Sequence, residues 1–538
     1  MEHLSYKRKI TIMIAIMVSM FFASINQTIV GVAMPRIIAK LNGMDYYTWV
    51  MTIYLLTSTI STILVGKLSD IYGRKHFILG GIVIFIIGAF LSGTAQNIIH
   101  LITYRGVQGV GAGIIMATAF TAVGDLFSPR ERGRWAGIMS AVFGISSILG
   151  PGLGGYIVDH LDWHWVFWIF LPLGFVAFFM IMFLFPQVER RESESIDYLG
   201  SLFLTLTIVP LLLAFSWAGT KYAWSSYTIL SLFTGTLVAL IIFLYIETKV
   251  KSPVLPLSLF RNSVISISNI VGFMMFAGMF GALMYMPFYV QGVLGVSATY
   301  AGYVTMPMSI SMFTMNAYAG NRMTKIGKYK KMALLGLFTM LIGMLLMTIM
   351  DSIPMAVLSM VVFGGGLGLS MPVFMIAIQN AVDSKDLGVA TASMQLFRNL
   401  GGTIGIAVMG TILSTSIRSR LAESGFSTSN LDPEMAQNLA QFQSPQILLD
   451  PSKLTDIQSS LPESLQAVFT QMIDSLREAL AGSLSNVFLA GAMVLLIALI
   501  VTFFLKEVPL RTTVRKIEEI EPKDQKESSS DIIPSVSK

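Results

Sequence analysis

Long apolar runs recur along this sequence, and they constrain its fold more than any other feature. They lie at about 10–34, 47–68, 77–95, 101–125, 135–158, 165–185, 198–217, 227–246, 264–290, 297–319, 332–350, 354–378, 389–416 and 484–505. Each run is long enough to cross a hydrocarbon core of about 30 Å as a helix. Only 12% of the residues are charged, against roughly 25% in soluble proteins. The sequence therefore predicts an all-α membrane protein with 14 transmembrane helices.

The first run is predicted to be a true transmembrane helix. It extends from Ile10 to Val32, which is too long for the apolar part of a cleaved signal peptide, and no small-residue cleavage site follows it. The chain has no cysteine, which excludes disulfides, thiolate metal sites and cysteine catalysis. Histidines at metal-ligand spacing are also lacking, so we expect neither a metal nor a cofactor.

The basic residues predict the orientation. They gather in alternate loops, at 7–9, 74–75, 130–134, 190–191, 249–251 and 322–331. The other loops before the last span hold little beyond Arg36, Lys40 and Lys221. Because cytoplasmic loops are enriched in lysine and arginine, we expect a multi-pass protein with both termini in the cytoplasm. The net charge of +6 then reflects topology and does not indicate a nucleic-acid partner.

A charged turn joins the second and third runs. It reads Gly66-Lys67-Leu68-Ser69-Asp70-Ile71-Tyr72-Gly73-Arg74-Lys75, and it resembles the signature of the major facilitator superfamily of secondary transporters. Gly66 and Gly73 permit close helix approach and a tight bend. The resemblance implies that Asp70 faces the N-terminus of span 13, where the helix dipole favours a carboxylate. It also implies that Arg74 pairs with an acid at the cytoplasmic end of span 4, which is Asp125 here.

A weak echo of this turn indicates an internal repeat. Gly320-Asn321-Arg322-Met323-Thr324-Lys325-Ile326-Gly327-Lys328 lies between spans 10 and 11, with Thr324 in place of the aspartate. We therefore expect a six-helix N-terminal bundle at 1–197, a two-helix insert at 198–247 and a six-helix C-terminal bundle at 248–505. The polar segment 417–483, with predicted helix starts at Asp432-Pro433, Asp450-Pro451 and Ser460, should form an external helical hairpin or cap. Residues 506–538 should form a disordered cytoplasmic tail.

Span 4 carries an arginine inside the membrane. The segment Leu101-x-x-x-Arg105-x-x-Gln108-Gly109-x-Gly111 resembles the second motif of the superfamily, which implies that Arg105 acts in proton transfer or in coupling. An ionised side chain at this depth costs several kcal/mol unless it is paired or hydrated. The alternative is that backbone carbonyls and Gln108 simply neutralise the charge.

Span 5 is rich in small residues. Gly144-Ile145-Ser146-Ser147-Ile148-Leu149-Gly150-Pro151-Gly152-Leu153-Gly154-Gly155 presents small residues four apart, which favours close helix contact, and Pro151 bends the helix. The pattern resembles the antiporter motif of drug exporters. Gly150 and Pro151 are therefore candidate gating residues.

Two further segments make the resemblance specific to one family within the superfamily. Trp163-His164-Trp165-Val166-Phe167-Trp168-Ile169 and Gln395-Leu396-Phe397-Arg398-Asn399-Leu400-Gly401-Gly402 look like spans 6 and 13 of the fourteen-helix drug:proton antiporters. The resemblance covers residues 1–505. It implies the major facilitator fold, energy from a proton gradient, and a monomer in a bacterial plasma membrane. It also makes Arg398 a candidate gating or coupling residue.

Span 1 departs from this family. It has Asn26 where the family usually has an aspartate, and no Asp or Glu lies near any predicted midplane. Asparagine cannot carry a proton, so coupling should rest on Asp70 or Asp125 linked to Arg105, or be absent. With Arg105 and Arg398 as its buried charges, the cavity should prefer neutral, zwitterionic or anionic amphiphiles over cations.

Fold analogy places the substrate cavity between spans 1, 4, 9 and 12. The candidate substrate-binding residues are Asn26, Met116, Phe120, Phe273, Met274, Tyr285, Met371 and Met375. Methionine and phenylalanine adapt to varied apolar shapes. Most of the 35 methionines should nevertheless serve packing or lipid contact.

Three functions remain to be distinguished. The first is an exporter of hydrophobic or amphiphilic compounds, such as a multidrug efflux antiporter, that works by alternating access in contact with membrane lipid. The second is an exporter of a lipid or lipid-like metabolite, which the missing carboxylate and the large outer segment would suit. The third, a non-transporting receptor or a membrane enzyme, lacks support because the sequence has no phosphate-binding loop and no carboxylate pair in the membrane.

Overall fold

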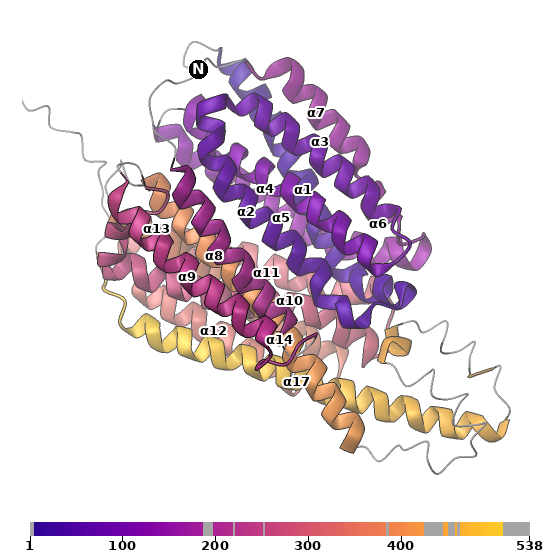
Figure 1. The fold of residues 1–538 in the computed structure, drawn as a ribbon. Helices are drawn as coiled ribbons and strands as arrows, with labels where there is room; N and C mark the ends of the chain where they lie inside the picture. Colours follow the sequence, from indigo (N-terminus) through magenta and orange to yellow (C-terminus); the bar gives the residue numbers. More distant parts are fainter. Residues whose placement is uncertain are drawn as a thin grey trace, which may run out of the picture.

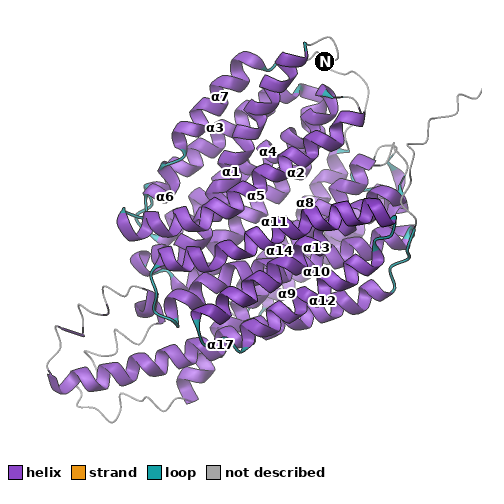
Figure 2. Cartoon of the chain, turned by 180° about the vertical axis from the view of Figure 1, so that it is seen from behind, coloured by secondary structure: helices purple, strands orange, loops and turns teal. Residues whose placement is uncertain are grey.

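The structure is a computed structural model of the 538-residue chain. It describes residues 5–127, 129–186, 197–218, 221–250, 253–382, 387–423, 445–449, 454, 458–459 and 463–508. Within these ranges the regular structure is helical, apart from one isolated bridge between Ala218 and Tyr222 (Figure 2). The predicted all-α class is therefore confirmed.

The helices form two bundles that lie side by side (Figure 1). The N-terminal bundle holds α1 (Tyr6–Leu41), η1 (Met44–Tyr46), α2 (Tyr47–Tyr72), α3 (Arg74–Gly93), α4 (Ile98–Leu126), α5 (Pro129–His160), α6 (Trp165–Trp168) and α7 (Leu171–Leu184). The C-terminal bundle holds α10 (Ser263–Gly292), α11 (Ala298–Ile326), α12 (Lys330–Thr348), α13 (Ile353–Ala381), α14 (Leu387–Glu423), η4 (Pro445–Leu449) and α17 (Glu463–Phe503). Between them in sequence come α8 (Tyr198–Trp217), α9 (Tyr227–Lys249) and η2 (Leu257–Arg261).

The number of membrane-crossing segments agrees with the sequence. Among the described residues, 12 helical segments are long and apolar enough to cross a membrane, with α6 and α7 counted as one segment. The helices α2 and α11, of 26 and 29 residues, have the length to span it too and pack between the others. Together they account for the 14 predicted spans.

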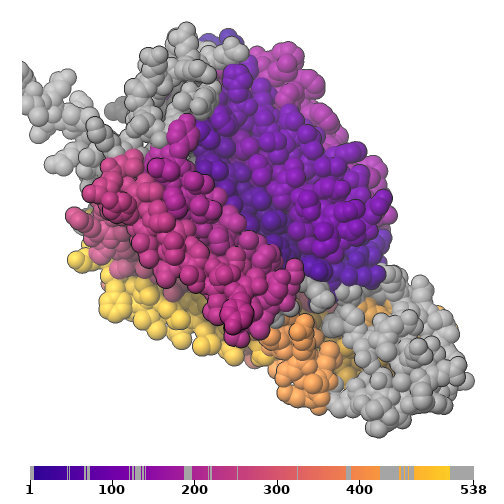
Figure 3. Space-filling model, in the orientation of Figure 1, coloured from indigo at the N-terminus to yellow at the C-terminus, as the bar shows by residue number. Residues whose placement is uncertain are grey.

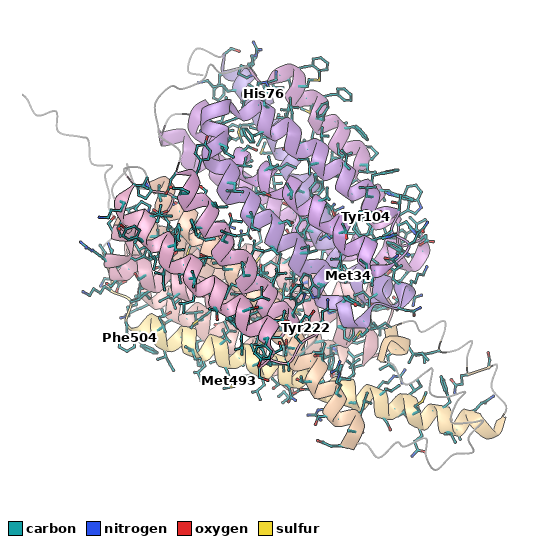
Figure 4. All side chains as sticks on the ribbon, viewed as in Figure 1. Met34, His76, Tyr104, Tyr222, Met493 and Phe504 are labelled. Carbon is teal, nitrogen blue, oxygen red and sulfur yellow. The ribbon has the colours of Figure 1, made fainter. Side chains whose placement is uncertain are left out.

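The first helix, α1, runs from one end of the molecule to the other. We call the end that carries Tyr6 the N side and the end that carries Leu41 the distal side. In Figure 4, His76 near the start of α3 and Phe504 just after α17 lie on the N side, whereas Met34 and Tyr222 lie toward the distal side.

Several pairs of helices join the bundles. They are α5 with α11, α2 with α14, and α1 with α10, α11 and η4. The helices α8 and α9 pack on each other, and α8 also contacts α2 and α14. Its Ile208 shares a hydrophobic cluster with Leu56 of α2 and Leu396 of α14. In Figure 3 the magenta insert lies between the indigo N-terminal bundle and the yellow α17 on the face in view.

The charged turn between the second and third spans is shorter than predicted. Helix α2 continues to Tyr72 and α3 begins at Arg74, so Gly73 alone separates them. Its φ of 96° lies in a region that glycine adopts at little cost. Gly66 is helical, and the bend therefore depends on Gly73.

The last span is longer than predicted. Helix α17 begins at Glu463 and runs for 41 residues into the final span without a break. Phe469, Met472, Leu476 and Leu480 on its first half are buried, as their helical spacing predicts. The predicted helix starts at Asp432-Pro433, Asp450-Pro451 and Ser460 lie outside the described residues, as does the tail from 509 to 538.

Candidate functional site

A buried polar cluster in the N-terminal bundle surrounds Arg105. This residue lies seven positions after Ile98, the first residue of α4, and its side chain is fully buried. Its Nη1 donates to Oε1 of Gln108 at 2.7 Å and to Oδ1 of Asn26 at 3.4 Å. Nε2 of Gln108 donates to the same Asn26 oxygen at 2.9 Å. The amide oxygen of Asn26 on α1 thus accepts from two side chains of α4.

Helix α2 completes the surroundings of Arg105. The guanidinium carbon lies 4.1 Å from the centre of the Tyr54 ring, within the range of a cation–π interaction. Its Nη2 lies 3.9 Å from the sulfur of Met51. Nε of Arg105 and Nδ2 of Asn26 are buried without a hydrogen-bond partner. Neutral groups therefore stabilise this charge in the described structure, and donors remain available.

The C-terminal bundle buries a second arginine. Arg398 on α14 is 3% exposed, and its Nη2 donates to the carbonyl oxygen of Met371 on α13 at 3.0 Å. Its guanidinium carbon lies 5.1 Å from the centre of the Phe276 ring of α10. Among the residues that the structure describes, Nε has no hydrogen-bond partner. Arg398 thus lies where three helices of this bundle meet.

The glycine-rich segment of α5 packs closely on both sides. A Cβ at Gly150 would overlap the hydroxyl of Thr28 on α1, and a Cβ at Gly302 of α11 would overlap the carbonyl oxygen of Pro151. The hydroxyl of Ser309 donates to the carbonyl oxygen of Ser147 at 2.8 Å. Small residues thus bring α5 into backbone contact with α1 and with α11 of the other bundle.

Hydrogen bonds also join the bundles near the distal side. Oη of Tyr47 donates to the carbonyl oxygen of Met284 at 2.8 Å, and Nε2 of Gln291 donates to that of Val32 at 3.2 Å. The backbone N–H of Thr299 donates to Oδ2 of Asp159 at 2.6 Å. Because Thr299 is the second residue of α11, this carboxylate of α5 meets the positive end of a helix dipole.

The short helix η4 bridges the same region. Leu448 and Leu449 are buried, and Nη1 of Arg36 on α1 donates to the carbonyl oxygen of Leu449 at 3.4 Å. A cavity of about 220 Å³ lies between α1, α5, the α10–α11 connection and η4. Its lining residues are Arg36, Asp159, Gln291, Val296, Ser297, Ala298 and Leu449.

The structure describes the predicted site residues to different extents. The side chains of Asp70, Asp125 and Phe120 and the surroundings of Gly66 lie outside the described part of the structure, and Arg74 is the partly buried first residue of α3. The predicted contact of Asp70 with the start of α14 and that of Arg74 with Asp125 therefore stay predictions. The structure brings Arg105, Asn26 and Gln108 together, and it places Arg398 in the other bundle.

The candidate substrate-binding residues differ in exposure. Met116, Phe273, Met274, Met371 and Met375 are partly buried, which leaves part of each side chain open to contact. Tyr285 is fully buried, and its Oη donates to the carbonyl oxygen of Ile406 at 3.3 Å. Its ring lies 6.0 Å from that of Tyr47. Tyr285 therefore belongs to the packing of the distal region in this conformation.

Sequence reasoning missed several residues of these contacts. Tyr54 and Tyr47 carry no charge and lie in an apolar run, so no local pattern distinguishes them from core aromatics. Asp159 lies at the end of a predicted span, where a carboxylate is common and does not by itself indicate a contact. Its position at the end of the glycine-rich helix could have suggested a contact with a neighbouring helix N-terminus.

Comparisons with known proteins agree with this architecture. The family model described as Major Facilitator Superfamily matches residues 16–406. Multidrug transporter protein MdtP of Bacillus subtilis (strain 168) is 36% identical over 522 residues, covering 95% of this chain and 95% of that protein. Multidrug resistance protein 3 of the same organism is 32% identical over 510 residues, covering 93% and 96%. A solved bacterial homolog of the human lysosomal transporter Spinster, inward-facing and unoccupied, has a TM-score of 0.63 at 14% identity and covers 93% of this chain and 98% of that chain.

Two packed helical bundles with buried polar side chains, together with these relatives, identify the chain as a multi-pass membrane transporter. The match over most of the chain makes the assignment specific. The chain belongs to the Major Facilitator Superfamily, and its relatives are transporters, not enzymes.

Proposed function

We propose that this protein is a secondary exporter of hydrophobic or amphiphilic compounds that works by alternating access. The observation that carries the proposal is the set of hydrogen bonds joining the two bundles near the distal side, at Tyr47, Gln291 and Asp159. Such contacts must break if the bundles are to open there. Two relatives that align along almost the whole chain are named as multidrug proteins, which supports efflux of drugs.

The N side is the cytoplasmic side in this proposal. Arg74 and Lys75 at the start of α3, and Lys328 between α11 and α12, lie at that end, as the positive-inside rule requires. The protein then lies in the plasma membrane of a bacterium with its distal side closed to the exterior. The domain boundaries stated above belong to the same proposal, and so does a monomeric state.

A proton gradient is the energy source that we propose. Arg105 is the coupling residue, because its charge is buried and two of its neighbours, Asn26 and Gln108, are neutral amides. Since neither amide carries a proton, the proton carrier is one of the carboxylates predicted at the cytoplasmic ends of spans, Asp70 or Asp125. No cofactor is needed for this mechanism.

Everted membrane vesicles with an imposed pH gradient test the proposal. Wild type should accumulate a neutral fluorescent drug only while the gradient lasts, and at least one of Asp70→Asn and Asp125→Asn should abolish this accumulation. Asp351→Asn, at an exposed position between α12 and α13, is the matched control and should transport normally. Accumulation that persists after an ionophore collapses the gradient would exclude proton coupling. A wild type that moves no drug in either condition would exclude drug efflux.

A further inference from the structure

Arg398 is a buried charge in the first half of a membrane-spanning helix, about three turns from its start. It lies 11 residues after Leu387, the first residue of α14, which corresponds to a depth of about 16 Å along the helix. Arginine keeps its charge in proteins, and a charge at such a depth is costly unless it has a partner. The partners of Arg398 therefore show whether its charge is compensated within the bundle.

The observed partners leave the charge of Arg398 without compensation. The carbonyl oxygen of Met371 accepts one of five N–H donors, and the Phe276 ring lies at 5.1 Å. Nε is buried without a partner. Arg105, by comparison, is surrounded by two side-chain amides and a closer ring, at 4.1 Å. Arg398 thus keeps more unused capacity for an anion than Arg105 does.

The buried carboxylates that the structure describes lie elsewhere. They are Asp197 and Glu247. Asp197 accepts from the backbone N–H of Gly200 at 2.7 Å, at the start of α8. Glu247, near the end of α9, accepts from the backbone N–H groups of Val254 and Leu255. Both carboxylates accept hydrogen bonds at the N-side ends of α8 and α9. Neither of them therefore compensates the charge of Arg398.

The two helices that contact Arg398 carry apolar side chains that are partly exposed. Its nearest helices, α10 and α13, carry Phe273, Met274, Met371 and Met375, all of which are partly exposed. Flexible methionines and an aromatic ring suit an apolar body of variable shape, whereas the guanidinium suits one anionic group. The ligand that matches both features is an amphiphile with a single negative charge.

We propose that Arg398 is the specificity-determining residue that binds the anionic group of an amphiphilic substrate, a carboxylate attached to an apolar body. This inference rests on the proposed transport function and adds the charge class of the substrate. The Nε and Nη donors of Arg398 form charge-assisted hydrogen bonds with the anion, and the partly exposed methionines contact the apolar body.

Binding of two matched probes tests this role. The probes are dansylamino-undecanoic acid and its primary amide, which share the apolar body and differ in charge. Each is titrated by fluorescence against purified protein in a neutral detergent, at an alkaline pH where the acid is ionised. Wild type should bind the acid about tenfold more tightly than the amide, the least expected for a hydrogen bond to a charged group. Arg398→Gln should bind both probes with the affinity that wild type has for the amide.

Two variants separate the site from general charge effects. Arg398→Lys keeps the charge without the planar fork, so it should retain part of the preference for the acid. Arg418→Gln removes an exposed arginine from the same helix and should leave the preference unchanged. Equal binding of both probes by wild type would overturn the proposal, and so would a preference that survives in Arg398→Gln.

Transport of the amide keeps this test independent of the proposed function. If wild type prefers the acid in micelles but exports neither probe from everted vesicles, the export function fails and the anion site stands. If the amide is exported and no preference for the acid is found, the anion site fails and export stands. If Arg398→Gln does not fold, the ratio of the affinity for the acid to the affinity for the amide is compared between wild type and Arg398→Lys. The proposal expects a smaller ratio in Arg398→Lys, and an unchanged ratio would overturn it.

Discussion

At the scale of single residues, the buried arginines show how a charge is held in an apolar bundle. Asn26, Gln108 and Tyr54 surround Arg105 from α1, α4 and α2. A hydrogen bond to a charged group contributes about 1.5–3 kcal/mol, which offsets part of the desolvation cost. The amide at position 26 therefore has a structural role here in addition to any role in substrate binding.

Replacing Asn26 by Asp should stabilise the protein. The oxygen that accepts from Arg105 and Gln108 stays in place, the buried amide nitrogen without a partner is removed, and a carboxylate faces the guanidinium. We expect Asn26→Asp to raise the unfolding temperature in detergent, by the equivalent of about 1–3 kcal/mol. The control is Asn97→Asp, which exchanges the cap of α4 for an equally good one. A lower unfolding temperature would show that position 26 needs a neutral side chain.

A second residue-scale prediction concerns pH at the distal side. Asp162 lies 2.8 Å from Nδ1 of His164 and 3.8 Å from Nζ of Lys40. Burial alone would raise the pKa of Asp162, but the hydrogen bond with His164 and the charge of Lys40 hold that pKa below its usual value. A carboxylate with a lowered pKa contributes stability above its unfolded pKa, and this contribution is lost as the pH falls through the folded pKa.

Asp162→Asn should therefore lower the unfolding temperature slightly at neutral pH. The cost should stay below about 1 kcal/mol, because the side chain is largely exposed and solvent screens the pair. The difference between variant and wild type should vanish as the pH falls below about 4, the usual pKa of an aspartate. Unfolding temperatures measured across this range check the prediction, which a difference that is independent of pH would contradict.

At the scale of helices, sequence periodicity predicts most of the structure. The 14 spans and the bend at Gly73 follow from apolar runs and glycine placement. The uninterrupted helix α17 does not follow from the sequence pattern, because its polar N-terminal half and its apolar C-terminal half look like two separate elements. Contacts between distant spans, such as Tyr54 with Arg105 and η4 with Arg36, depend on tertiary packing that no local pattern encodes.

The contact between α5 and α11 gives an element-scale prediction. Gly302 of α11 is buried, and a Cβ there would overlap the carbonyl oxygen of Pro151, a backbone atom that cannot move aside cheaply. We expect Gly302→Ala to destabilise the protein by about 1–3 kcal/mol and to slow transport. Gly235→Ala in α9, where the added Cβ meets nothing within 4 Å, should be neutral or slightly stabilising. Thermal unfolding and vesicle transport of both variants test the contrast, and equal effects would contradict it.

The short helix η4 gives a second prediction at the scale of helices. Leu449 is 1% exposed, and it packs beside Gly292 of α10 while its carbonyl accepts from Arg36 of α1. Leu449→Ala should cost about 2–5 kcal/mol in thermal unfolding. The neighbouring Ile447 is only partly buried, so Ile447→Ala should cost less. If both substitutions lower the free energy of unfolding equally, Leu449 is not the residue that holds η4 against α1 and α10.

At the scale of the whole molecule, the two bundles are joined by contacts that a transport cycle must break. The sequence identifies both bundles, but it could not tell which end is closed, because every conformation of a transporter has the same sequence. Ser147 on α5 and Ser309 on α11 lie at this boundary, joined by a 2.8 Å hydrogen bond. Locking them together should arrest the cycle if the bundles move apart there.

The absence of native cysteines makes this test direct. In the double variant Ser147→Cys/Ser309→Cys, a short cleavable thiol cross-linker should reduce transport at least tenfold, because it holds α5 and α11 together. A reductant that cleaves the linker should restore transport. The matched control, Thr348→Cys/Ser485→Cys, links α12 to α17 inside one bundle, where the Ser485 hydroxyl donates to the Thr348 carbonyl at the same 2.8 Å. That cross-link should leave transport intact, because the two helices move as one body. Full transport by the protein cross-linked between α5 and α11 would mean that this boundary does not open during the cycle.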